Sequence, residues 1–176
     1  MSEKDPRFPI GKFRAPELFS AENRGGFIGT IASAPARLRA AVTGLSAAEL
    51  DTPYREGGWT IRQVVHHVPE SHMNAYIRFK LALTETDPVI KPYDEAAWAR
   101  LNDVSVAPVE ASLGLLDCLH QRWVVLMRGM SAEEWKRRFI HPEYGRGMTL
   151  EHTLALYAWH SDHHIAHVWQ ALGLPL

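Results

Sequence analysis

The chain has 176 residues, a length typical of a single domain with a sizeable core. It contains 19 Lys and Arg against 20 Asp and Glu, so its net charge of −1 offers no basic field for nucleic acid. A single cysteine, Cys118, excludes an intrachain disulfide, and we expect it to be a small hydrophobe in the core. No apolar run approaches the roughly 20 residues that span a membrane. We therefore expect a cytoplasmic protein that binds neither nucleic acid nor a membrane.

The first segment, residues 1–18, carries Pro6, Pro9 and Pro16 and has no clear hydrophobic period. It is too charged and too interrupted by prolines for a signal peptide. We expect an extended arm that packs over the rest of the chain or over a neighbouring subunit. Residues 19–176 show no repeat or linker and are predicted to form one domain.

The first two long helices of this domain are each predicted to contain a proline. The first is expected over residues 21–45 and the second over 61–83, the latter with a capping-box start at Thr60. Because proline lacks a backbone N–H, Pro35 should kink or divide the first helix and Pro69 should bend the second.

The remaining elements follow from the same apolar periodicity. They are a loop over 87–92, a short helix over 94–101, a long helix over 109–130, a short helix over 131–138, a turn or small hairpin over 141–147, and a long helix over 149–172. No segment shows a convincing strand pattern. Four long amphipathic helices predict an all-α four-helix bundle with short extra helices.

The last helix holds four of the ten histidines of the chain within residues 160–167. Residues four apart are stacked on a helix, so His160 with His164, or His163 with His167, can direct two imidazoles at one point. Two such imidazoles are half of a metal site. His160 and His164 flank the apolar stripe of the helix, whereas the other pair is rotated towards the opposite side, so a buried metal favours the first pair. The alternative is that both are hydrogen-bonded histidines at the edge of the core.

A third ligand would come from the second long helix, which offers His66, His67 and His72. Helical phase does not separate them cleanly. His72 lies nearest the centre of the apolar stripe and is the slight favourite, although a buried His72 is equally compatible with a hydrogen-bonded core histidine. The residues alone leave this choice open.

Several motifs resemble a known family. The run from Gly58 to Val68 resembles the second-helix signature of DinB-like proteins, and the histidines at 160–167 resemble their fourth-helix signature. Four further segments resemble the YfiT branch of that family: residues 51–60, 71–81, 91–95 and 156–161. The resemblance covers nearly the whole chain after the arm.

This resemblance implies a metal site and selects its ligands. In the YfiT branch, the second histidine of the His-His pair binds the metal with two fourth-helix histidines four apart, which implies His67, His160 and His164 here. The choice of His67 departs from the preference for His72 given by phase. Two features depart from the family pattern: many DinB-like proteins carry Gln at the position of His167, and Pro69 is unusual within the second-helix motif. The family also implies a homodimer.

Three neutral imidazoles would leave a divalent ion with its charge intact and a coordination position open. Such an ion lowers the pKa of a bound water or thiol. Nitrogen ligands suit Zn²⁺ and Ni²⁺ alike, so we expect one divalent ion per chain without deciding which. Candidate substrate contacts beside His67 are Ser71, Asn74 and Arg78, whose alternative interpretation is an ordinary polar helix flank.

The resemblance implies an enzyme of one of two kinds: a metal-dependent hydrolase, or a transferase that joins a low-molecular-weight thiol, such as bacillithiol, to an electrophile. We favour the transferase and retain the hydrolase. The fourth helix lacks the His-Glu-x-x-His motif that supplies the base of zincin proteases. A third hypothesis is a bundle that binds a metal or small ligand without catalysis. A role in DNA binding finds no support in the charge balance.

Overall fold

The computed structural model describes residues 5–175, without the side chain of Arg146. Four long helices form a bundle, which confirms the predicted fold class. They are α1 (Ala21–Val42), α3 (Ile61–Thr84), α6 (Val109–Arg128) and α8 (Leu150–Ala171). A Ser or Thr side chain caps three of them by accepting a backbone N–H of the first turn: Ser20 for α1, Thr60 for α3 and Thr149 for α8.

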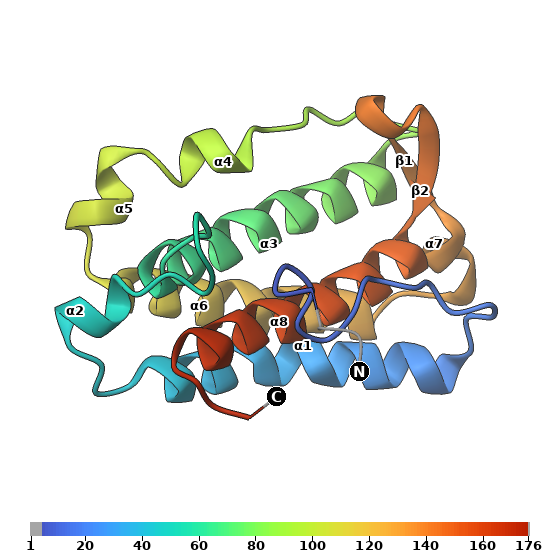
Figure 1. Ribbon diagram of the computed structural model, residues 1–176. Helices are drawn as coiled ribbons and strands as arrows, with labels where there is room; N and C mark the ends of the chain where they lie inside the picture. Colours follow the sequence, from blue (N-terminus) through green and yellow to red (C-terminus); the bar gives the residue numbers. More distant parts are fainter. Residues whose placement is uncertain (1–4, 176) are drawn as a thin grey trace.

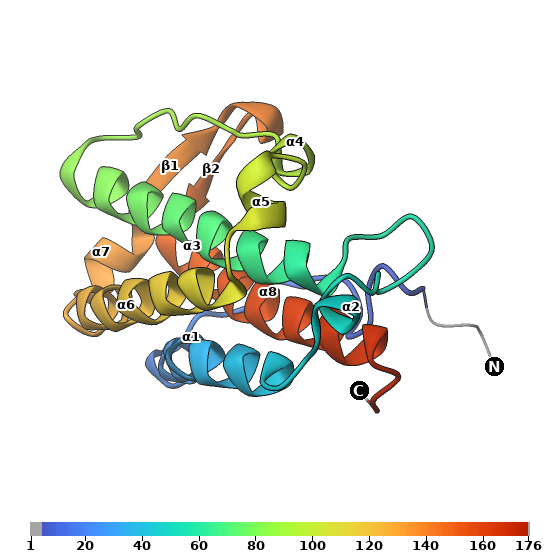
Figure 2. The ribbon, with the colours of Figure 1, turned by 90° about the vertical axis from the view of Figure 1, so that its left-hand side faces the viewer.

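The order of the helices in the bundle differs from a simple up-and-down arrangement. Viewed towards one end, α1 packs against α8 and α6, and α3 packs against the same two helices (Figure 2). The first two long helices of the chain, α1 and α3, are therefore diagonal to each other, whereas consecutive helices are neighbours in an up-and-down bundle. The neighbours α3 and α6 run in the same direction (Figure 1). Their connection must therefore return along the length of the bundle, and it does so beside α3. It carries α4 (Glu95–Trp98) and α5 (Asn102–Val106).

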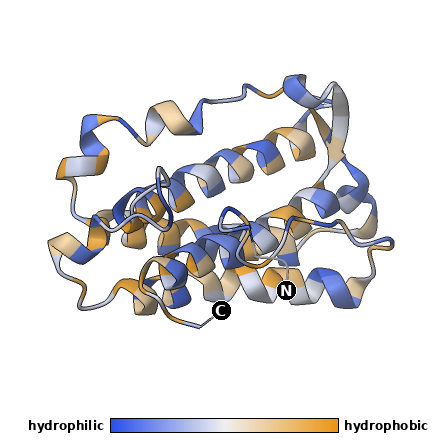
Figure 3. Cartoon of the chain, viewed as in Figure 1, coloured by the Kyte–Doolittle hydropathy of each residue, from blue (hydrophilic) through white to orange (hydrophobic). Residues whose placement is uncertain are grey.

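The core consists of two apolar clusters, one towards each end of the bundle. One cluster is centred on Phe79, Trp123 and Leu154, and the other on Leu38, Leu116 and Ile165. Apolar residues recur along all four long helices (Figure 3). Between the two clusters lies a polar layer, in which His72 of α3, His120 of α6 and His160 of α8 occupy the positions where each helix passes from one cluster to the other.

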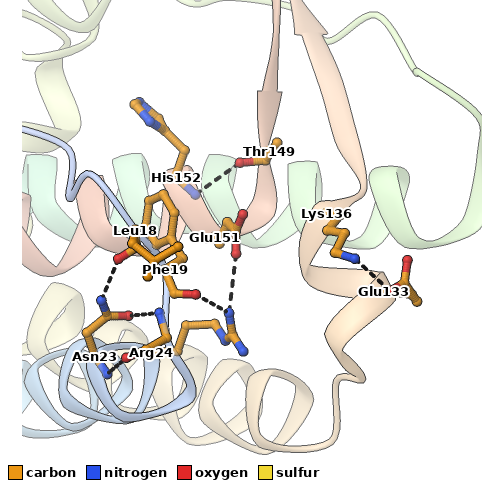
Figure 4. Close-up of polar contacts among 10 residues, drawn as sticks. Leu18, Phe19, Asn23, Arg24, Glu133, Lys136, Thr149, Glu151 and His152 are labelled. Carbon is orange, nitrogen blue, oxygen red and sulfur yellow. Dashed lines mark hydrogen bonds and ion pairs between the residues drawn. The ribbon is translucent and has the colours of Figure 1, made fainter.

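The starts of α1 and α8 are joined by a partly buried cation. The Arg24 guanidinium donates to the Phe19 carbonyl and to the Glu151 carboxylate, both at 3.3 Å (Figure 4). Both charged side chains are less than one-fifth exposed, which reduces the screening of this ion pair by solvent. The contact fixes α1 against α8, the helix that carries the histidine cluster.

Neither proline divides its helix. Helix α1 runs through Pro35 to Val42 and α3 runs through Pro69. Of the two outcomes expected for the first helix, a kink or a division, the division is wrong. Pro35 is buried, and so are residues of α1 before and after it. The packing of these buried residues stabilises one continuous helix. The N–H that proline lacks would have bonded the carbonyl four residues earlier, at Ile31. That carbonyl instead faces Nδ1 of His120, 2.6 Å away.

Short elements fill the connections. Helix α7 (Ala132–Lys136) lies within the short helix predicted over 131–138, whereas α5 was not predicted. Helix α2 (Ala47–Leu50) begins with a capping box between Ser46 and Glu49. An antiparallel hairpin of β1 (Arg138–His141) and β2 (Arg146–Thr149) leads into α8. The sequence indicated only a turn or small hairpin there, because four-residue strands are too short to show a period.

The N-terminal arm crosses α8 of its own chain. Trp159 Nε1 donates to the Gly11 carbonyl at 3.2 Å, and the Gln170 amide donates to the Pro6 carbonyl at 3.0 Å. The Phe13 ring meets the edge of His152 at 5.4 Å between centroids. Residues 5–19 thus cover one side of the histidine-rich helix.

Cys118 is exposed on α6, so the expectation of a core hydrophobe is wrong. Its position faces away from the stripe of Leu113, Leu116 and His120 that the helix buries. Over residues 5–175, we find no helix with the length and apolar character needed to span a bilayer.

Candidate metal centre

Three histidines from two helices converge on one point. His67 of α3 and His160 and His164 of α8 each offer one ring nitrogen, and these nitrogens lie within 4.8 Å of one another. His160 Nε2 and His164 Nε2 are 3.2 Å apart. Two Zn–N bonds of about 2.0–2.1 Å at a tetrahedral angle would separate their nitrogens by about 3.3 Å, so this pair fits a shared cation. Within residues 5–175, no other set of three His, Cys, Asp or Glu converges in this way.

The packing of the bundle positions these side chains. His160 and His164 are one turn apart on α8. The neighbouring helix α3 runs antiparallel to α8 (Figure 1), and its His67 lies opposite them. The Trp59 indole, just before α3, packs against His67 at 4.7 Å and stacks parallel to His164 at 6.5 Å between centroids. The Trp59 side chain therefore covers the site.

Burial keeps the three rings neutral at pH 7. It lowers the pKa of His67 to about 4. Burial is also the main reason that the pKa values of His160 and His164 lie well below 6.5, and the neighbouring histidines lower them further. Neutral imidazoles present lone pairs, which is the form that binds a metal.

These low pKa values make the stability of the metal-free protein depend on pH. Burial lowers the pKa values of His67, His120 and His167 to about 4, whereas an unfolded histidine titrates near 6.5. Between these values the unfolded state binds more protons, so the free energy of unfolding falls as pH decreases from about 6.5 to about 4. Each such group contributes about 1.4 kcal/mol per pH unit well inside this window.

We therefore expect the urea midpoint of metal-free protein to be lower at pH 5 than at pH 7.5. The measurement is chemical unfolding followed by circular dichroism in the presence of a chelator. Equal midpoints at the two pH values would contradict the assignment of these histidines as buried and neutral.

His72 and His66 lie outside the convergent group. His72 is fully buried, and its Nε2 lies 3.1 Å from Nδ1 of His160, the nitrogen on the side away from the site. The structure therefore does not bring His72 to the convergent nitrogens, in contrast to the preference based on phase. His66 Nδ1 lies 2.7 Å from the Ser112 hydroxyl on α6. Helical phase places a residue on a face, but it does not show which neighbouring side chain that face meets.

The second pair on α8 lies under the N-terminal arm and beside the loop before α3. His163 stacks on Trp159 at 4.3 Å, and His167 stacks on Tyr54 at 3.9 Å between centroids. Nε2 of His167 lies 3.4 Å from the Arg7 carbonyl. Both rings are buried, although phase directed them away from the bundle core, because the arm and the loop cover that side of α8.

The three candidate substrate contacts differ in their surroundings. The Ser71 hydroxyl is buried and lies 3.5 Å from His160 Nε2, beside the convergent nitrogens. The Asn74 amide donates to the Glu70 carbonyl at 2.9 Å, as on an ordinary helix flank. Arg78 is half-buried, and its charge acts on the Tyr93 phenol, whose pKa burial raises to about 12. Ser71 is therefore the candidate that lies beside the convergent nitrogens, and Tyr93 is a neighbour of Ser71 that the sequence did not indicate.

Comparison with known proteins agrees with this fold. The pattern that defines the DinB superfamily matches residues 30–168, and the chain belongs to this superfamily. Within it, the chain is 49% identical over 168 residues to "Putative metal-dependent hydrolase YfiT" of Bacillus subtilis. The aligned residues make up 96% of this chain and 94% of that protein. A second relative named as a "Putative metal-dependent hydrolase", from Bacillus cereus (strain B4264), is 51% identical over 164 residues, which are 93% of this chain and 94% of that protein.

A solved structure shows the same arrangement of helices. It is YfiT from Bacillus subtilis, described as a "probable metal-dependent hydrolase with an unusual four-helix bundle topology". It superimposes with a TM-score of 0.92 at 47% identity, over 97% of this chain and 99% of that one. The YfiT branch indicated by the sequence motifs is thus confirmed, and the diagonal placement of α1 and α3 accounts for a bundle that is not simply up-and-down.

Proposed function

We propose that the protein is an enzyme that binds one divalent cation, Zn²⁺ or Ni²⁺, through His67, His160 and His164. The observation that carries the proposal is the convergence of three buried, neutral imidazoles without a fourth His, Cys, Asp or Glu in the group, over the part of the chain described. This donor set fits a catalytic site, which keeps a position for substrate, better than a closed structural site. The names of the relatives support a metal-dependent reaction.

A bound divalent cation would lower the pKa of a water or thiol placed at the open position. The side chains around the cation would limit the access of water and contact the bound group. Trp59 packs over two of the three histidines and limits the access of water to them. The Ser71 hydroxyl, 3.5 Å from His160 Nε2, can donate a hydrogen bond to a group bound beside that nitrogen.

We favour S-transfer, in which a low-molecular-weight thiol such as bacillithiol attacks an electrophile. The convergent group contains imidazoles alone, so it offers no carboxylate to remove a proton from water. A thiol needs less assistance, because its ordinary pKa near 8.5 is already close to neutral pH. Hydrolysis of a small molecule is the second candidate, and the names of the relatives favour it.

Two parallel assays separate these reactions. We expect untagged, metal-loaded protein to accelerate the loss of thiol in the presence of monochlorobimane, and we expect chelation to abolish that acceleration. Activated esters are offered in the same buffer without thiol. Ester turnover without thiol consumption would establish the hydrolase instead. Stoichiometric metal binding with neither reaction would establish a non-catalytic metal-binding bundle.

A further inference from the structure

A line of buried hydrogen-bonding groups crosses the polar layer and joins all four long helices. His160 Nδ1 on α8 lies 3.1 Å from His72 Nε2 on α3. His72 Nδ1 lies 2.8 Å from His120 Nε2 on α6. His120 Nδ1 lies 2.6 Å from the Ile31 carbonyl on α1. His72 and His120 are 0% and 1% exposed, and within residues 5–175 the ring nitrogens of both form no hydrogen bonds other than those in this line.

The direction of this line follows from its last member. A carbonyl oxygen can only accept, so Nδ1 of His120 must carry a hydrogen. A neutral imidazole carries one hydrogen, so Nε2 of His120 is an acceptor and Nδ1 of His72 must donate to it. With its one hydrogen on Nδ1, neutral His72 has a lone pair on Nε2, and this Nε2 accepts the Nδ1–H of His160.

This line of hydrogen bonds determines the protonation of the His160 nitrogen that faces the site. With its hydrogen on Nδ1, His160 presents the lone pair of Nε2. This is the nitrogen that lies 3.2 Å from His164 Nε2. The tautomer that a metal ligand needs is therefore fixed from behind, by groups that do not touch the metal position.

The acceptor at the end of the line is available because of Pro35. In an uninterrupted helix the N–H of residue 35 would bond the Ile31 carbonyl, and proline has no N–H. His120 supplies the missing donor at 2.6 Å. The Ile31 carbonyl, which Pro35 leaves without its helical donor, and the buried Nδ1–H of His120 thus satisfy one another.

We propose that His72 and His120 are positioning residues that hold His160 in the Nδ1–H tautomer, with its Nε2 lone pair directed at the cation. This inference deepens the proposed metal site and rests on it for its functional consequence. Hydrogen-bond partners behind a ligand histidine commonly fix its tautomer and orientation. Here the partner is a second neutral histidine, which is itself oriented by a third.

The first test needs no metal. Two-dimensional ¹H–¹⁵N spectra of ¹⁵N-histidine-labelled, metal-free protein at pH 8 distinguish the two tautomers by their ring nitrogen shifts. We expect His72, His120 and His160 all to carry the hydrogen on Nδ1. A hydrogen on Nε2 of His72 or His120 would overturn the proposal, whether or not the protein binds a metal.

The second test measures Zn²⁺ affinity by competition with a chelating indicator. His72→Leu removes the acceptor for His160, and we expect it to weaken binding roughly 10- to 100-fold. His72→Gln retains an oxygen that can accept from His160 Nδ1, so it should recover most of this loss. His120→Leu touches no ligand, but it frees His72 to change tautomer, and we expect a smaller loss.

The matched control is His66→Leu, on the same helix with similar burial but bonded to Ser112. It should leave the affinity within about twofold of wild type, and thermal melts establish that each variant is folded. Equal losses in His66→Leu and His72→Leu, or full affinity in folded His72→Leu, would overturn the positioning role. Absence of binding in the wild type would instead overturn the proposed metal site, while the tautomer result would stand.

Discussion

Replacing His160 with alanine should remove the divalent cation and reduce turnover to the uncatalysed rate. His160 is the ligand that joins the site to the polar layer: its Nε2 faces His164 and its Nδ1 faces His72. Without it, two imidazoles on different helices remain. The loss of affinity should exceed the roughly 10- to 100-fold that removal of an outer hydrogen-bond partner costs.

The measurement is metal content per chain together with thiol turnover, both on protein purified without a histidine tag. His152→Ala is a suitable control, because it removes an imidazole from the same helix outside the convergent group. We expect about one cation per chain in the control and none in His160→Ala. Unchanged turnover in His160→Ala and after chelation would refute the catalytic role.

The second large effect concerns the core. Phe79→Ala should lower the free energy of unfolding by about 3–5 kcal/mol, the range for removing a buried aromatic side chain. Phe79 is 0% exposed and meets the edges of Trp123 at 5.3 Å and Trp135 at 6.2 Å between centroids. These bulky rings cannot close over the cavity without leaving their own contacts.

Ile77→Ala is the matched control on the same helix. Ile77 is 49% exposed, so its replacement should change the free energy of unfolding by no more than about 0.5 kcal/mol. Urea unfolding of both variants at pH 7.5 gives the comparison. A loss below about 1 kcal/mol in Phe79→Ala would show that this cluster is not the tightly packed core described above.

The sequence predicted the elements of the bundle better than their contacts. Apolar periodicity located all four long helices, and the spacing of His160 and His164 predicted a pair that the structure does bring together. The order of helices around the bundle was not predictable in this way. Periodicity shows which face of a helix is buried, but not which helix covers it. For that reason helical phase alone favoured His72, whereas the family resemblance implied His67.

Local rules also failed where tertiary packing opposed them. Pro35 was expected to kink or divide the first helix, but its buried position and the substitute donor from His120 preserve a continuous α1. Cys118 was expected in the core because of its residue type, although it lies on the exposed face of α6. The burial of His163 and His167 depends on an arm and a loop distant in sequence, which no helical pattern can reveal.

The central claim is that three imidazoles from α3 and α8 share one divalent ion that keeps an open coordination position. X-ray absorption spectroscopy on untagged, metal-loaded protein tests it directly, with His67→Ala measured beside the wild type. We predict three histidine nitrogens at about 2.0–2.1 Å with at least one exchangeable oxygen, and loss of the ion in the variant. A fourth protein ligand closing the coordination sphere, or the same spectrum in His67→Ala, would contradict it.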